Sequence, residues 1–143
     1  MTCDELIAAL EACTIAPAEF THRAHMQVGF DYLQRDGYAG ALASMPNALR
    51  RFAAHHGKHG LYHETVTVAF LTLIHERMAG DLIALRCEVG DLEWESFAGR
   101  HADLFTSDLL GRYYSKDTLR SELARRCFVL PCVAKDVSRG AVS

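Results

Sequence analysis

Apolar residues recur three and four positions apart along most of the chain, and this spacing places them on one face of an α-helix. Leu6, Leu10 and Cys13 follow it and predict a helix over residues 4–14. Pro17 ends this pattern and begins a short connection. The first element expected is therefore a short amphipathic helix.

Two further helices are predicted on either side of the turn signal Asp36–Gly37. The first spans residues 21–35, with Thr21 as a candidate N-cap. The second spans residues 38–56, where apolar and aromatic side chains keep a 4-3-4-3-4 spacing. Pro46 lies inside this second pattern and lacks a backbone donor, so we expect a kink or a break just before it.

A fourth helix is predicted over residues 62–78, after Gly57 and Gly60 have ended the third. Its β-branched residues at 65–68 would also suit a strand. The run contains no Gly or Pro and is longer than most strands, which favours a helix.

The C-terminal third is less regular. Residues 81–89 fit neither a helix nor a strand clearly. Helices are expected over residues 93–104, 109–114 and 118–127, and an extended segment over residues 128–133. The sequence therefore predicts one all-α domain spanning residues 1–143, with a four-helix bundle-like core and additional short C-terminal helices.

Composition narrows the possible partners. Half of the 143 residues are hydrophobic and the formal net charge is -3, so nothing favours binding to nucleic acid or to an anionic membrane surface. The longest strongly apolar run, residues 66–74, is too short to cross a bilayer. We expect no nucleic-acid or membrane partner.

The cysteines favour a cytoplasmic protein. Five are present without a C-x-x-C pair, and no export signal precedes them, so free thiols in a reducing compartment are expected. Cys127 and Cys132 could form a metal or redox pair, but buried, unreactive thiols are the favoured interpretation.

Six of the eight histidines lie near the ends of predicted helices. Short connections make successive helices antiparallel, so the helices 21–35 and 62–78 are expected to run parallel. His22 and His25 would then lie at the same end of the bundle as His63. His56, at the end of the third helix, would lie there too. Four imidazoles are predicted to converge.

Converging imidazoles suggest a metal centre. His22, His25 and His63 are the expected ligands of one divalent ion (Zn, Fe, Ni or Cu), with His56 or Glu64 as additional ligands. An open coordination position would make the leading interpretation a metalloenzyme that acts on a small molecule. In that case Glu64 or Tyr62 would serve as acid or base. Gly29, one turn beyond His25, would either leave space below the histidines or allow close helix packing.

Two alternatives need no metal. Helix N-termini and histidines could hold an anionic small molecule through a phosphate or carboxylate group, with Arg50, Arg51 or Arg112 as counter-charges. The other alternative is a helical protein-interaction domain in which the histidines are structural.

Two motifs carry a resemblance to a protein family. Phe20-x-His22-x-x-His25 and Tyr62-His63-x-Thr65 resemble the F-x-H-x-x-H and Y-H-x-T motifs of an uncharacterised family of small helical bacterial proteins. The tail segments "RYYS" at residues 112–115 and "ARRCFV" at residues 124–129 are similar to that family's tail. The resemblance covers roughly residues 20 to 130 and implies that the three histidines act together, without indicating a chemistry.

Overall fold

The structure, a computed structural model, describes residues 2–106 and 108–132. For Cys3 it describes the backbone but not the side chain. Within these ranges every regular element is helical. The main helices are α1 (Cys3–Glu11), α2 (His22–His55), α3 (Glu64–Leu85), α4 (Trp94–Arg100), α5 (Lys116–Arg120) and α6 (Glu122–Arg126). The predicted all-α fold, with a four-helix core and short C-terminal helices, is confirmed.

The 34-residue element α2 contains both of the predicted helices 21–35 and 38–56. Gly37 divides them, with φ 76° and ψ 176°, a conformation that a residue with a Cβ rarely adopts. On the near side of this break Gly29 approaches Ile74 and Leu71 of α3. On the far side the Tyr38 hydroxyl lies 2.8 Å from that of Thr72.

These contacts fix the relative directions of the helices. From residue 22 to residue 36, α2 contacts residues that lie progressively nearer the C-terminal end of α3. Gln34, near the end of this stretch, contacts residues beyond that end, because its Nε2 donates to the carbonyls of Val89 and Leu92. From residue 38 to residue 55, the contacts of α2 lie progressively nearer the N-terminal end of α3, and His56 lines the same cavity as His63. The first half of α2 is therefore parallel to α3 and the second half antiparallel, as predicted.

Pro46 does not break the helix. The backbone stays helical from residue 38 to residue 55, so the predicted break is wrong, and the alternative of a kink stays a prediction. A proline inside a helix costs roughly 3 kcal/mol. Pro46 is buried, and its neighbours Met45, Leu49 and Phe52 belong to the core, so their packing offsets the lost hydrogen bond.

Helix α3 differs from the predicted range at both ends. It begins at Glu64 with His63 as N-cap and continues to Leu85, beyond the predicted end at residue 78. Asp81, in this extra portion, pairs with Arg100 and His101 of a later segment. Residues 81–85 were ambiguous from local pattern because this stabilising contact is distant in sequence.

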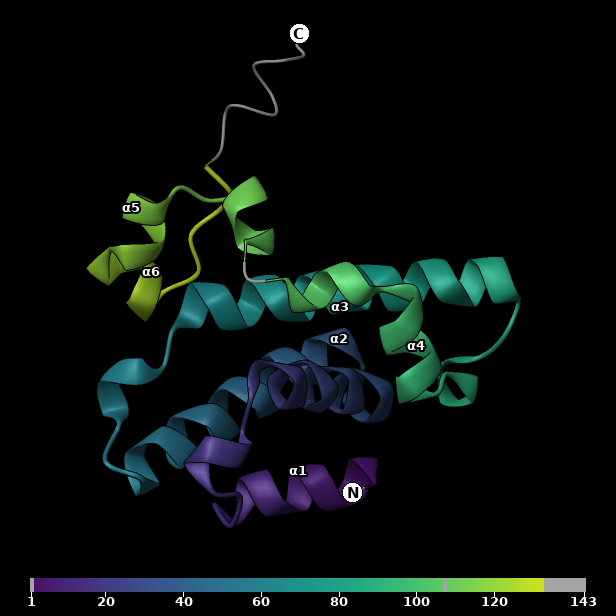
Figure 1. Ribbon diagram of the computed structural model, residues 1–143, viewed down its shortest axis with the longest axis horizontal. Helices are drawn as coiled ribbons and strands as arrows, with labels where there is room; N and C mark the ends of the chain where they lie inside the picture. The colour runs from purple at the N-terminus through teal and green to yellow at the C-terminus, as the bar shows by residue number, and fades with distance from the viewer. Residues whose placement is uncertain (1, 107, 133–143) are drawn as a thin grey trace, which may run out of the picture.

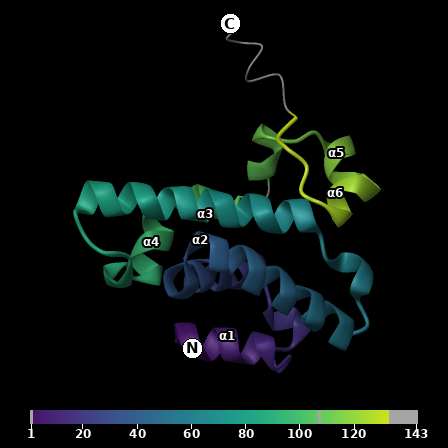
Figure 2. The ribbon, with the colours of Figure 1, turned by 180° about the vertical axis from the view of Figure 1, so that it is seen from behind.

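The later segments pack at opposite ends of α3 (Figures 1 and 2). Helix α4 lies toward its C-terminal end, the 3-10 turn η4 (Ala102–Phe105) lies along its middle, and α5 and α6 lie at its N-terminal end. The predicted helix 93–104 thus forms as two pieces, and residues 109–112 form a 3-10 turn, η5. The predicted helix 118–127 is divided at Ser121, which has extended backbone angles and caps α6.

The last described residues, 127–132, contain no helix, in agreement with the expected extended segment; Val133 lies outside the described residues. Thr65, fully buried in α3, donates to the carbonyl of Cys127 and accepts from the backbone N–H of Val129. The tail is therefore attached to the start of α3. None of the helices described combines the length and apolar character needed to cross a lipid bilayer.

Candidate functional site

A cavity of about 420 Å³ lies where the C-terminal end of α2 meets the beginning of α3. Between these helices runs the 3-10 turn η2 (His59–Leu61). The apolar lining comes from Pro17, Phe20, Leu49, Phe52, Ala53, Leu61 and Val66. Polar side chains on the wall include His25, His56, Lys58, Tyr62 and His63. Three of the four predicted histidines thus line one cavity.

His25 presents an uncharged imidazole to this cavity. Burial lowers its pKa below the ordinary value of 6.5, outweighing a hydrogen bond to Thr21 that raises it, and the neighbouring His22 adds to the lowering. Nδ1 donates to the Thr21 carbonyl at 3.0 Å, and the ring stacks on Phe20 with centroids 3.9 Å apart. Because Nδ1 carries the proton, Nε2 is left as a hydrogen-bond acceptor.

His56 is the C-cap residue of α2 and packs edge-on against Phe52. Its Nε2 is buried and has no hydrogen-bond partner among the described residues. A buried polar atom without a partner is uncommon in folded proteins, and an ordered water or another bound molecule is the usual partner. His56 is therefore the strongest single pointer to a ligand in this cavity.

His63, in contrast, uses both ring nitrogens within the chain. Nδ1 accepts the backbone N–H of Val66 and caps α3, and Nε2 donates to the Leu119 carbonyl at 2.6 Å. Neither nitrogen is available as a ligand without breaking one of these bonds. The structure gives His63 a structural role at the cavity wall.

His22 does not line the main cavity, although it was predicted to converge with His25, His56 and His63, and it is exposed overall. Its Nε2 donates to the Leu104 carbonyl at 3.1 Å, and its ring contacts Phe70 and Phe105. It lines a second cavity of about 300 Å³ together with His25. His22 therefore joins the start of α2 to η4.

Within residues 2–106 and 108–132, no three His, Cys, Asp or Glu side chains are grouped so that they could hold a metal ion. His22, His25 and His63 lie at one end of the bundle as predicted, but each directs a nitrogen to a backbone carbonyl of a different segment. The three-histidine metal centre stays a prediction that this arrangement does not favour.

The candidate acid and base, Tyr62 and Glu64, bind each other. The Tyr62 hydroxyl donates to the Glu64 carboxylate, which also accepts from Arg50 at 2.9 Å. Burial, followed by the hydrogen bond and the charge of Glu64, raises the pKa of Tyr62 far above neutral pH. The phenol therefore stays protonated and acts as a donor, and Arg50 covers its ring with 4.7 Å from guanidinium to centroid.

Gly29 lines the second cavity, with Met26, Met45 and Phe70. A Cβ added there would lie 3.1 Å from Ile74 Cδ1 and 3.5 Å from Leu71 Cδ2. Both predictions for Gly29 are partly correct. The glycine allows a close approach of α2 to α3, and it also borders the space below the histidines.

Three residues that contribute to this end of the molecule were missed by sequence reasoning: Lys58, Arg125 and Arg126. Lys58 could have been found, since it lies in the connection between the two converging helices. The two arginines lie in the last turn of α6. Of the other predicted counter-charges, Arg51 reaches the Glu11 carbonyl at the end of α1, and Arg112 is exposed in η5.

None of the four cysteines whose side chains the structure describes lines the cavity. Cys13, Cys87, Cys127 and Cys132 are free thiols, as expected. The expectation that Cys127 and Cys132 are buried is wrong, because both are exposed on the segment that follows α6.

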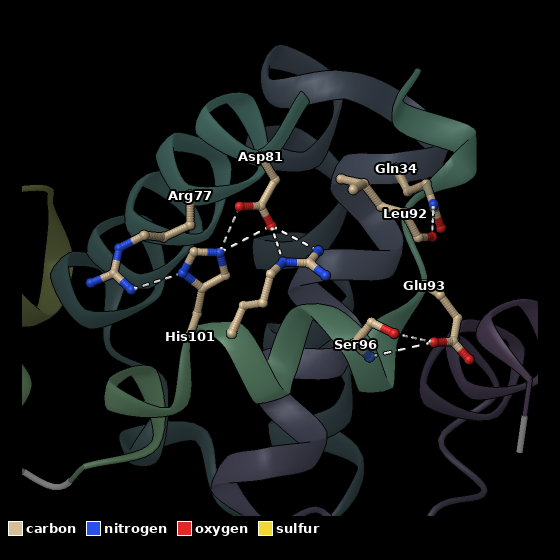
Figure 3. Close-up of polar contacts among 8 residues, drawn as sticks. Gln34, Arg77, Asp81, Leu92, Glu93, Ser96 and His101 are labelled. Atoms are coloured by element: carbon tan, nitrogen blue, oxygen red, sulfur yellow. Dashed lines mark hydrogen bonds and ion pairs between the residues drawn. The ribbon is translucent and has the colours of Figure 1, made fainter. Parts of the chain in front are cut away.

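A second polar cluster, also missed, lies at the far end of α3 (Figure 3). His101 lies between Arg77 and Asp81, accepting from Arg77 at Nδ1 (3.3 Å) and donating to Asp81 at Nε2 (3.0 Å). Arg100 donates twice to the same Asp81 carboxylate, and Arg77 forms a bidentate pair with Asp103. This cluster attaches α4 and η4 to α3.

A scan against protein-family models and searches of curated proteins and of solved structures gave no match to this chain. The resemblance of the two histidine motifs to a bacterial family stays a prediction. Any functional conclusion must therefore come from the site itself.

Proposed function

We propose that the protein binds a small molecule that inserts an apolar part into the cavity between α2 and α3. The volume of about 420 Å³ lies within the range of small-molecule sites, which are mainly apolar with a few polar groups. The observation that carries the proposal is this largely apolar lining together with the His56 side chain on it, whose buried Nε2 has no partner among the described residues.

The polar groups define what the ligand must offer. His25 presents an acceptor, Nε2, and the unpaired nitrogen of His56 requires a partner as well. Lys58 adds a positive charge. An apolar ring or chain with one hydrogen-bonding group satisfies these requirements, and the aromatic walls Phe20 and Phe52 favour flat or flexible apolar groups.

Indole is a suitable first probe, because it is uncharged, apolar and carries one N–H donor. It would be titrated into ¹⁵N-labelled protein and followed by two-dimensional NMR. We expect saturable shifts at the amides of Phe20, Leu61 and Val66, and little change at those of α4. Absence of saturable shifts at the cavity would contradict the proposal.

A matched pair of variants on α2 tests the location. Ala53 lines the cavity and Ala43 is exposed on the same helix. Ala53→Phe fills the space and should weaken indole binding by about tenfold or more, equivalent to about 1.4 kcal/mol. Ala43→Phe should bind indole like the wild type. Equal binding by the two variants would place the site elsewhere.

The same samples test the metal alternative. Zn²⁺ added to the wild type should not be retained after gel filtration, since His63 has no free nitrogen and no third ligand is grouped nearby. Retention of zinc by the wild type, lost in His22→Ala, His25→Ala and His63→Ala, would restore the three-histidine centre.

A further inference from the structure

We infer that the ligand is an elongated amphiphile with an anionic end: its apolar part, which carries the hydrogen-bonding group that the cavity requires, occupies the cavity, and its carboxylate or phosphate lies outside, on Arg50, Arg125 and Arg126. This inference rests on the proposed function and adds the chemical class of the ligand. It is carried by a groove of about 620 Å³ that adjoins the cavity.

The groove and the cavity share one rim. Tyr62 belongs to the lining of both. On α2, Ala53 faces the cavity and Ala54 the groove. On η2, Leu61 faces the cavity and Gly60 the groove. A ligand longer than the cavity would therefore pass over Tyr62 and enter the groove.

The charge of the groove differs from that of the whole protein. Its lining includes Arg50, Arg125 and Arg126 against a single carboxylate, Glu122. Counting also Glu64, which pairs with Arg50, the region keeps a positive excess in a chain of net charge -3. Such a local excess attracts an anionic group and orients it.

The arginines keep hydrogen-bonding capacity for an anion. Arg125 is held over η2 by one bond to the Gly60 carbonyl, and a guanidinium has five N–H donors. Arg126 pairs with Glu122, but both side chains are largely exposed, and exposed pairs of this kind are weak. An incoming carboxylate or phosphate can replace Glu122 as the partner of Arg126, with bidentate geometry.

The His25 imidazole inside the cavity supports this orientation of the ligand. His25 is held uncharged by burial, so the cavity itself offers the anion no charged histidine there. The guanidinium groups lie in the groove outside. Lys58, which is exposed, is a single cation of the cavity lining, whereas the groove lining has three guanidinium groups. The anionic end is therefore better placed in the groove than against His25.

The test compares octanoate with 1-octanol, which has the same tail without the charge, by isothermal titration calorimetry. We expect octanoate to bind the wild type about tenfold or more tightly than octanol, and its advantage to fall as NaCl is raised. In Arg125→Gln/Arg126→Gln, the gap between the two affinities should close. Arg120→Gln, an exposed arginine of α5 outside the groove lining, should keep the gap.

Because Arg125 also holds Gly60, a second variant avoids this contact. Glu122→Gln removes the one carboxylate that the described residues contribute to the groove lining, and should strengthen octanoate binding without affecting octanol. Equal affinity of the wild type for octanoate and octanol, or an unchanged gap in both the arginine and the Glu122 variants, overturns the inference while leaving the cavity as a binding site. If neither octanoate, octanol nor indole binds, the proposed function itself fails. Octyl phosphate distinguishes the two anions by the same comparison.

Discussion

The two ends of α3 use histidine in opposite ways. At the C-terminal end, His101 has both ring nitrogens paired, with Arg77 and Asp81, and only 15% of its side chain is exposed. At the N-terminal end, His56 keeps a buried nitrogen without a partner in the described chain, beside a cavity. Both ring nitrogens of His101 thus have partners within the chain, whereas His56 Nε2 has none among the described residues.

This comparison separates structural from candidate ligand-binding histidines by their hydrogen bonds rather than by their position. His63 lines the same cavity as His56, yet its two bonds place it with His101. A buried nitrogen without a partner is costly, so a water or a ligand that completes its bond should stabilise the protein. Substitutions of the structural histidines, of their partners and of the candidate ligand-binding histidines test this contrast.

The largest effect is expected from Asp81→Ala. The change leaves His101 and Arg100 without the carboxylate that they share and should lower the free energy of unfolding by about 2–4 kcal/mol. Urea denaturation measures it. Glu95→Ala, which breaks an exposed pair with Arg23, is the control and should cost less than about 1 kcal/mol. Equal losses would show that the Asp81 cluster is not a structural connection.

Acid should reveal the same cluster. Burial raises the pKa of the Asp81 carboxyl, but hydrogen bonds from His101 and Arg100, and their charges, outweigh it, so the pKa is lowered below 3.8. A lowered carboxyl pKa contributes stability that is present above pH 3.8 and is lost as the pH falls through the folded-state pKa. The wild type should lose more stability below pH 3.8 than Asp81→Asn does.

The next effect is expected at His63. His63→Ala removes both the N-cap of α3 and the bond to the Leu119 carbonyl, and should cost about 2 kcal/mol. His56→Leu exchanges an unpaired buried nitrogen for an apolar group and should cost less than about 1 kcal/mol. Thermal denaturation of the two variants compares them. A larger loss for His56→Leu would place His56 among the structural histidines.

Much of the core could be predicted from sequence, because apolar side chains at helical spacing report directly which face is buried. The alternation of helix directions also placed His25, His56 and His63 at one end correctly. The break at Gly37 followed from its turn signal. Pro46 misled the prediction, because the packing around it depends on residues from other helices.

The hydrogen bonds of the histidines could not be predicted. His22 and His63 meet the carbonyls of Leu104 and Leu119, which lie in later segments. Every residue carries a carbonyl, so the sequence does not indicate which one a histidine will reach. A pattern of histidines can therefore predict convergence but not whether the nitrogens stay free, and that second property decides between ligand and structural element.

A smaller effect is expected from the pH dependence of His25. Its pKa is lowered in the folded protein by burial, so the unfolded chain binds more protons as the pH falls below 6.5. The stability that neutral His25 provides is complete above pH 6.5 and is lost as the pH falls toward its folded-state pKa. His25→Asn keeps a donor for the Thr21 carbonyl but does not titrate, so its stability should decline less between pH 7 and pH 5.

The control for this prediction is His59→Asn, at an exposed position in η2. Its stability should follow the wild-type pH profile, measured by urea denaturation at each pH. If His25→Asn and the wild type decline equally, burial of the neutral imidazole does not contribute to stability at this end of α3.

The smallest effect is expected at Gly29, where the second cavity should leave room for an added methyl group. In Gly29→Ala, the gain in helix propensity is about 1 kcal/mol, and the new Cβ would lie 3.1 Å from Ile74 Cδ1. Ile74 lines the 300 Å³ cavity, so its terminal methyl group has space to move by the few tenths of an ångström required. The variant should be as stable as the wild type or more stable by up to about 1 kcal/mol. Gly37→Ala, at φ 76°, is the opposite control and should lose about 1 kcal/mol by urea denaturation. A loss at Gly29 as large as that at Gly37 would show that the helices are packed tightly there and that the Ile74 methyl group cannot move into the second cavity.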